Sequence, residues 1–463
     1  MKLKFSALTL VVFALGGCMV GPDYKRPNIH VSDHFKEAPA GWKFARPADM
    51  VNRGQWWRVW RDETLNDLTA QVAQENQTVA RAWANYREAR AKVQSARADF
   101  FPQVNLGAGI SRNESSSDSK KSLTLDAGWE IDFWGKTARN VEAAHASTDA
   151  QAAALAAAQL SQEAELIQNY FALRVLDQRK HLTRETIKLY ERTLTITENQ
   201  YKAGMVAKSD VMSAQAQLKN AQAQLLDLEL SRRQYEHAIA ILISKAPAEF
   251  SLPENLNWKP YFPQLPASLP SDLLERRPDI AQAERQMMAA NAKIGVAKAA
   301  FYPNISLSAS GGYKAIHLAD LFNVPSRVWS VGAALTEPLF DAGRRRAGVN
   351  SAEAVYDASE ATYRLTVLNA LQEVEDNLAA VTILAQERKL QAESLSAAKE
   401  SSRIALNQYR AGIKTFITVS SAQTTQYNTE QNVWQLSARQ LSAQVLLIKA
   451  LGGGWQTDML TTQ

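Results

Sequence analysis

Two segments of the chain share one arrangement of apolar and polar positions. Each begins as an alanine-rich helical stretch, reaches two aromatic residues and a proline, and then alternates apolar with polar residues. The first copy starts at Asn76 and breaks at 100–102, and the second starts at Arg277 and breaks at 301–303. A helix ends at or before the residue preceding a proline, and the period changes from 3.6 to 2 across each break. The pattern therefore predicts a helix that leads directly into a strand, twice.

A pair of strands is predicted after each break. In the first copy the two strands span 103–112 and 123–133. In the second copy, one strand ends near Tyr313 and the other spans 327–338. The strand at 123–133 has one polar and one apolar face, and its apolar positions are Leu123, Leu125, Ala127, Trp129, Ile131 and Phe133. Strands of this length and pattern are typical of a transmembrane β-barrel. A half-buried hairpin of a soluble α+β domain would have the same pattern.

Long helices are predicted after each strand pair, at 136–203 and 347–411. At about 1.5 Å per residue, each would extend on the order of 100 Å. Both end in the motif Gln-Tyr-Lys/Arg-Ala-Gly, and Gly204 and Gly412 stand where a glycine ends a helix. A further helix begins near Asp210 and its counterpart follows the second glycine. Their alanine and glutamine content favours coiled-coil packing with one solvated side.

The repeat divides the chain into six parts. We expect a signal peptide at 1–17, an N-terminal arm at 18–61, a first repeat at 62–245, a proline-rich joint at 246–270, a second repeat at 271–451 and a C-terminal tail at 452–463.

The N-terminus has the pattern of a secretory signal, with an apolar run at 5–15 that is too short for a mature membrane helix. Small residues then precede Cys18, the only cysteine of the chain. This resembles the lipobox of bacterial lipoproteins, in which cleavage leaves Cys18 as a lipidated N-terminus. An ordinary signal peptide that ends near a cysteine is the alternative. Met19 follows Cys18, which by resemblance to lipoprotein sorting favours the outer membrane.

Composition and motifs argue against nucleic-acid binding and against enzymatic chemistry. The net charge is only +5 over 463 residues, and no basic block with interleaved aromatics is present in the sequence. His30 and His34 form the only close histidine pair, and a surface pair is the more common origin of such spacing. We find no nucleophile motif and no phosphate-binding loop. No cofactor is expected beyond the covalent lipid on Cys18, and any energy for transport would come from a partner.

These features together resemble the TolC-like outer-membrane efflux family, in its lipoprotein (NodT-type) branch. The lipobox, the duplicated helix–strand–strand–helix–helix unit, the Phe-Phe/Tyr-Pro motif and the Gln-Tyr-Lys/Arg-Ala-Gly motif carry the resemblance, which covers essentially the whole mature chain. It implies an internally duplicated α+β membrane protein that forms a homotrimer. Each chain would contribute four strands to a twelve-stranded β-barrel in the outer membrane of a Gram-negative bacterium, and long helices to an α-helical barrel across the periplasm.

The resemblance also implies a function and partners. The trimer would be a passive exit duct for small molecules, docked through a periplasmic adaptor to an inner-membrane transporter, with Gly204 and Gly412 marking the docking tips. Neither the exported substrate nor the energy source of the pump follows from the sequence. The alternative is a periplasmic coiled-coil structural lipoprotein that does not conduct.

A periplasmic gate is implied at the helix tips. By the family's pattern, Asp210 would interact with Tyr409 and with Lys414, which stands where other members have arginine. Lysine cannot form the bidentate contact of arginine, so this contact would be weaker. Further along the second tip, Thr418 and Ser421 replace the acidic residues of other members. This sequence would then lack the cation-selective acidic constriction, or Asp210 would be its only acidic member. The alternative for Asp210 is a residue that is simply stabilised at a helix N-terminus.

Overall fold

The computed structural model describes residues 19–28, 35–37, 54–112, 118–263 and 277–453. They form two compact units, and each unit combines segments from both sequence repeats. The sheet unit lies within Met1–Ile29, Trp83–Ala154 and Asp279–Thr366. The tip unit lies within His30–Ala82, Leu155–Pro278 and Val367–Gln463.

The main helices of the described chain come in pairs of equal length, as the duplication predicts. α3 (Gln77–Ala98) and α6 (Pro278–Ala299) have 22 residues each, α4 (Lys136–Lys202) and α7 (Arg344–Arg410) have 67, and α5 (Lys208–Leu242) and α8 (Phe416–Ala450) have 35. α7 begins at Arg344 rather than at the expected residue 347. The Asp341 carboxylate accepts the backbone N–H of Arg345, so the helix is capped one turn earlier.

Four strands form one antiparallel sheet in the order β1-β2-β3-β4. They are β1 (Gln103–Ser111), β2 (Lys120–Ile131), β3 (Asn304–Ala315) and β4 (Arg327–Thr336). The expected ends of two strands were too late. β2 stops before Phe133, whose N–H bonds to the Ile131 carbonyl in a turn. β4 stops before Pro338, which has no N–H for a strand ladder.

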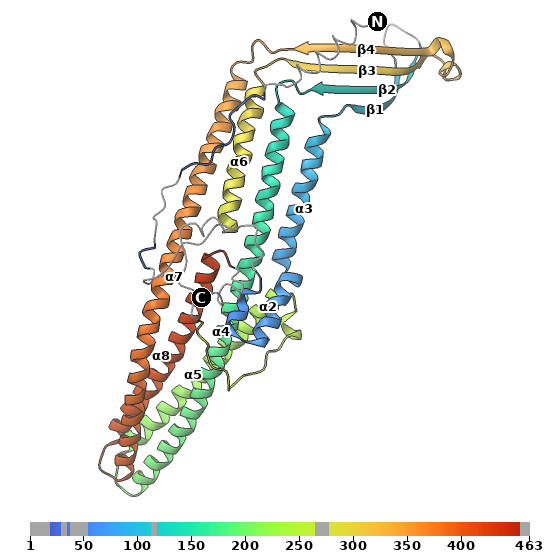
Figure 1. The fold of residues 1–463 in the computed structure, drawn as a ribbon. Coiled ribbons are helices and arrows are strands. Elements are labelled where there is room, and N and C mark those ends of the chain that lie inside the picture. The colour runs from blue at the N-terminus through green and yellow to red at the C-terminus, as the bar shows by residue number, and fades with distance from the viewer. Residues whose placement is uncertain (1–18, 29–34, 38–53, 113–117, 264–276, 454–463) are drawn as a thin grey trace. The chain divides into compact units, whose positions relative to one another are not determined.

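The sheet unit places these strands at one end of a row of helices. Figure 1 shows α3 leading into β1, α4 leaving β2, α6 leading into β3 and α7 leaving β4. The N-terminal arm at 19–28 packs against this row at a point where two glycines meet. A Cβ on Gly21 would lie 2.4 Å from the Cα of Gly295, so the backbones touch only because both residues lack a side chain.

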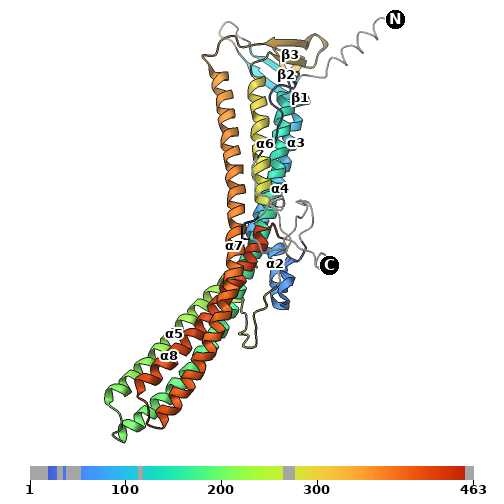
Figure 2. The same cartoon turned by 60° about the vertical axis from the view of Figure 1, so that its left-hand side comes forward.

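The tip unit has an aromatic and aliphatic core. A short helix, η1 (Trp56–Trp60), buries Trp56, Trp57 and Trp60 against α4, where Trp60 meets Phe171 edge to face. α2 (Glu63–Glu75) follows, with Asp62 accepting the N–H of Leu65 as an N-cap. In both views α5 and α8 lie alongside the adjoining parts of α4 and α7 (Figure 2).

The proline-rich joint is held to the tip unit by buried charges. Asp177 of α4 is fully buried between the guanidinium groups of Arg174 and Arg232, at 3.2 and 2.7 Å. Arg174 donates to the Pro253 carbonyl and Arg232 to the Leu252 carbonyl. Because each buried arginine meets both a carboxylate and a backbone carbonyl of the joint, its desolvation is offset and the joint is positioned.

Candidate functional site

The register of the sheet places apolar residues of all four strands on one face. Leu106 lies opposite Leu125, Ala127 opposite Ala309, and Ala309 opposite Val331. Because every second residue of a strand points to the same side, the other members of this face follow from these pairs. It comprises Val104, Leu106, Ala108 and Ile110 of β1, Leu123, Leu125, Ala127, Trp129 and Ile131 of β2, Ile305, Leu307 and Ala309 of β3, and Trp329, Val331, Ala333 and Leu335 of β4.

The opposite face is built from small and polar side chains. Its members include Gly107, Gly109, Ser122, Thr124, Ser306, Ser308, Ser310, Gly312, Ser330 and Gly332. Asp126 stands among them, and its carboxylate accepts the hydroxyl of Ser310 at 2.5 Å and that of Thr124 at 2.9 Å. An ionised carboxylate is costly to place against lipid, so its position on this face suits contact with water.

The apolar face is exposed in the single chain. Trp329 is 82% and Val331 76% solvent-accessible. A continuous exposed apolar surface marks a membrane or a protein contact. A sheet that is apolar on one side and polar on the other can separate lipid from water, which is the arrangement predicted from the 123–133 segment.

Both helix tips close with the same backbone motif. After α4, the N–H of Met205 reaches the Gln200 carbonyl and Gly204 has a φ of 71°. After α7, the N–H of Ile413 reaches the Gln408 carbonyl and Gly412 has a φ of 75°. These are Schellman caps, in which glycine takes a left-handed conformation that other residues adopt at a cost.

The two tips differ at the tyrosine of the shared motif. Tyr409 is 1% exposed, whereas Tyr201 at the corresponding place is 44% exposed. The Tyr409 hydroxyl lies 2.9 Å from the Thr197 hydroxyl of α4, and the Thr197 hydroxyl lies 2.9 Å from the Thr193 carbonyl. Since Thr197 donates to that carbonyl, Tyr409 donates to Thr197. Burial, with a smaller effect of the nearby Asp210 charge, raises the pKa of Tyr409, so its hydroxyl stays protonated.

The remaining predicted gate residues lie at the same tips. Asp210 is in the first turn of α5, partly buried, and near enough to Tyr409 to affect it electrostatically. Lys414 is exposed in the loop between α7 and α8. The tip unit thus brings Asp210 and Tyr409 into one neighbourhood, while no ion pair joins Asp210 to Lys414 among the described residues of this chain.

Comparison with known proteins identifies the architecture. The outer membrane efflux protein model matches residues 68–244 and 269–453. The chain belongs to the outer membrane efflux protein family. The probable efflux pump outer membrane protein TtgC of Pseudomonas putida is 30% identical over 97% of this chain and 95% of its own length. Outer membrane protein OprJ of Pseudomonas aeruginosa is 31% identical over 96% and 95%.

Solved structures agree with the sequence relatives. The outer-membrane channel OprN superposes with a TM-score of 0.85 at 29% identity, covering 95% of this chain and 100% of its own. The open state of the Neisseria gonorrhoeae MtrE outer membrane channel gives 0.81 at 27% identity, covering 94% and 98%. This outer membrane efflux protein is therefore a channel component that works in the outer membrane as an exit for efflux.

The N-terminal arm of this efflux protein is clamped beside the sheet by Arg139. Its buried guanidinium donates to the carbonyls of Val20 and Gly21 and bonds to Asp23 at 2.8 Å. Met19 packs on Gly135 at the junction of β2 and α4. The predicted lipidation residue Cys18 and the signal peptide at 1–17 lie outside the described residues, as do His30 and His34.

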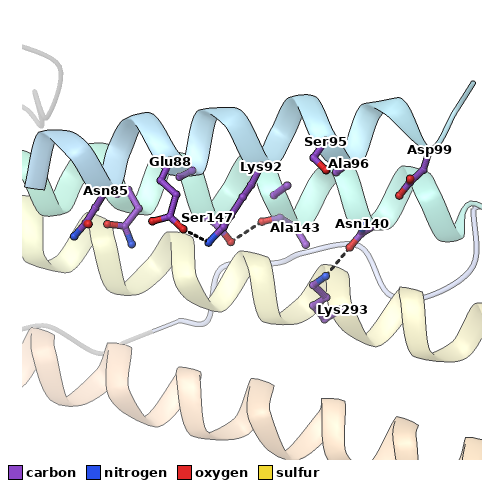
Figure 3. Close-up of a pocket in the computed structure, with 13 residues that line it drawn as sticks. Asn85, Glu88, Lys92, Ser95, Ala96, Asp99, Asn140, Ala143, Ser147 and Lys293 are labelled. Carbon is purple, nitrogen blue, oxygen red and sulfur yellow. Dashed lines mark hydrogen bonds and ion pairs between the residues drawn. The ribbon is translucent and has the colours of Figure 1, made fainter.

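A groove of about 640 Å³ runs between α3 and α4 in the sheet unit (Figure 3). Its floor is made of small side chains, with Ala143 and Ala96 both buried. Two charged side chains at its rim have partners, since Lys92 meets Glu88 at 2.6 Å and Lys293 donates to Asn140 at 2.6 Å. The two lysines that line the groove are therefore already engaged within the chain.

Within the described residues, no group of three or more histidine, cysteine, aspartate or glutamate side chains is placed to hold a metal ion. In the same part of the chain, no α-helix meets the length and hydropathy that a membrane-spanning helix needs.

Sequence reasoning missed two functional arrangements. The Arg139 clamp joins residues more than a hundred positions apart, and only the fold shows it. The sequence predicted that Tyr409 interacts with Asp210, at the start of α5, whereas the Tyr409 hydroxyl bonds to Thr197 on α4. The i, i+4 spacing of Thr193 and Thr197, which puts both hydroxyls on one face of α4, was a signal for this buried polar contact.

Proposed function

We propose that three copies of this chain form the exit duct of a tripartite efflux system, docked to a periplasmic adaptor and an inner-membrane pump. The observation that carries the proposal is the four-stranded sheet, which has one lipid-compatible face and ends in β1 and β4. An edge strand leaves backbone donors and acceptors unpaired, and in lipid these must be satisfied. Pairing β1 of one copy with β4 of the next would close twelve strands and satisfy both edges.

The polar face of small residues supports a water-filled interior. Side chains such as Ser308 and Gly332 would leave room for solutes inside a closed barrel. The helices α3, α4, α6 and α7 would continue this wall as an α-helical barrel. The duct is passive and non-enzymatic in this proposal, and the pump supplies the energy.

The proposal is tested by reconstitution of the purified protein in planar bilayers and by electrophoresis with and without heating. A heat-labile trimer that conducts ions is expected. A monomeric or helical rod without conductance would contradict the duct and favour a structural lipoprotein.

We also propose that Cys18 carries the lipid that anchors the arm. The clamp on residues 20–23 and the contact of Met19 with Gly135 hold the start of the described chain at the β2–α4 junction. A lipid on the preceding residue would then enter the leaflet beside the sheet. Metabolic labelling with a palmitate analogue should mark the wild-type protein and not a Cys18→Ser variant. Equal labelling of both would disprove the anchor.

Asp210, Tyr409 and Lys414 are proposed to hold the periplasmic end shut, with Gly204 and Gly412 at the adaptor-docking tips. The shared neighbourhood of Asp210 and Tyr409 supports this role. An Asp210→Ala variant should show larger single-channel conductance than wild type. Asp227→Ala, on the same helix but away from the tip, serves as the control, and equal conductance of Asp210→Ala and wild type would rule out the gate.

A further inference from the structure

The two junctions between a strand and a long helix are alike in sequence, but they differ in how far other segments of the chain pack over them. At β2–α4 the chain reads Glu-Ile-Asp-Phe-Trp-Gly, and at β4–α7 it reads Glu-Pro-Leu-Phe-Asp-Ala-Gly. In the first junction Trp134 stacks on Tyr302, donates to the Pro303 carbonyl, and receives the N–H of Val20 on its own carbonyl. The N-terminal arm and the end of α6 thus cover this junction.

The second junction has no such cover among the described residues. Leu339 is 90% and Phe340 88% exposed. Two adjacent apolar side chains so fully in contact with solvent are not explained by the packing of the chain itself.

Leu339 and Phe340 lie in a loop that is held by hydrogen bonds and an ion pair. The Asp341 carboxylate accepts the N–H of Gly343 at 3.0 Å and bonds to the Arg345 side chain at 2.7 Å. Arg345 also donates to the Pro338 carbonyl at 2.5 Å and lies over the Phe301 ring. Since the loop is tied at both ends, Leu339 and Phe340 are presented by a fixed backbone.

Two cations stand beside the apolar pair. Arg344 and Arg346 flank the inward-turned Arg345, both are exposed, and neither has an ion-pair partner among the described residues. They occupy the first turn of α7, where the helix dipole disfavours positive charge. Charges placed against the dipole and left without a protein partner are complementary to an external anion.

We infer that the β4–α7 junction is an interfacial lipid anchor, in which Leu339 and Phe340 enter the membrane and Arg344 and Arg346 bind the phosphates of anionic phospholipids. Apolar side chains next to arginines are the composition of segments that lie at a membrane surface. The inference rests on the proposed function, since the sheet must span the membrane for this junction to reach the headgroups. It would complement the lipid proposed on Cys18, because the described residues that follow Cys18 lie at the first junction.

The position of the apolar pair is tested with nitroxide labels at Phe340→Cys, Leu106→Cys and Tyr201→Cys, in vesicles of phosphatidylethanolamine and phosphatidylglycerol. Wild-type protein carrying only Cys18 is the blank. We expect the labels at 340 and 106 to be accessible to oxygen and the label at 201 to a water-soluble nickel complex.

Each other outcome is decisive. A label at 340 that is water-accessible, or shielded from both reagents by a neighbouring copy, overturns the anchor while the label at 106 still supports the spanning sheet. A label at 106 outside the lipid overturns the spanning sheet and the anchor with it.

The arginines are tested by phosphatidylglycerol binding to the detergent-purified protein. The Arg344→Gln/Arg346→Gln double variant should bind on the order of tenfold more weakly than wild type. Arg410→Gln, at the far end of the same helix, is the matched control and should bind as wild type does. Unchanged binding by the double variant would overturn the role of the arginines.

Discussion

The two helix tips share a sequence motif but differ in the burial and bonding of single residues. Tyr409 and Tyr201 occupy the same place in the shared motif, yet only Tyr409 is buried and bonded to Thr197. Duplication supplied two copies of the motif, and divergence around them made one tyrosine a structural link and left the other at the surface. Tyr201 is therefore the natural control for experiments on Tyr409.

Replacing Tyr409 by phenylalanine should loosen the tip unit. The change leaves the Thr197 hydroxyl oxygen without its donor and should cost about 1 kcal/mol. Hydrogen exchange of the amides near Thr197 should become about fivefold faster, as expected for local opening that is easier by this amount. Tyr201→Phe should leave exchange unchanged. Equal rates for Tyr409→Phe and wild type would show that the hydroxyl contact contributes nothing.

Gly412→Ala should destabilise the second tip by about 1 kcal/mol, because its φ of 75° places a Cβ in the left-handed region. Gly348→Ala is the control, because Gly348 lies inside α7, the helix that Gly412 follows, and an added Cβ there meets open space. That change should be neutral or stabilise the helix by about 0.5–1 kcal/mol. Thermal unfolding of both variants checks the prediction, and a stabilised Gly412→Ala would contradict it.

Among the helices, one stretch of the contact between α4 and α8 is buried and polar, in addition to the apolar core that these two helices share. Thr183 bonds to Tyr427, and Gln423 donates to Thr193. The glutamines of the long helices were expected to favour a wetted side, but Gln423 and Gln431 of α8 are buried in this seam. Glutamine can satisfy a neighbouring threonine, so a buried helix contact need not be apolar.

Acid should weaken the attachment of the joint to α4. Hydrogen bonding from Arg184, and then from Lys180, lowers the pKa of Glu254 from 4.5 to about 2. A carboxylate with a depressed pKa in the folded state adds stability that is present above about pH 4.5 and lost as the pH falls toward 2. The thermal stability of wild type should exceed that of Glu254→Gln at pH 7, and the difference should shrink across this window. A difference independent of pH would refute the electrostatic origin.

In the assembled protein, the two faces of the sheet should respond oppositely to charge. Val331→Lys places a cation on the apolar face and should cost about 2–4 kcal/mol in the membrane. Ser330→Lys, the adjacent residue on the polar face, should be tolerated. For each variant, the measurement is the amount of heat-modifiable protein recovered in outer membranes. Similar recovery of the two variants would contradict the assignment of the faces.

Much of the architecture was readable from the chain. The repeats, the strand pairs after Pro102 and Pro303, and the glycine ends at Gly204 and Gly412 all appear where the periodicity predicted them. These features are local, since propensity, capping and alternation act over a few residues. Boundaries at 338 and 347 were wrong by a few residues because a side-chain cap and a missing N–H decided them.

The amino-acid sequence by itself determined the duplication, the kind of each element and, through its motifs, the efflux family. Only the tertiary structure decided which of two equal motifs is buried, that Arg139 holds the N-terminal arm, and that Leu339 and Phe340 are left uncovered at the second junction. The physical reason is that these outcomes depend on contacts between residues far apart in the chain. The strand–helix junctions at 130–135 and 337–343 are alike in sequence, and their different surroundings arise only when the chain has folded.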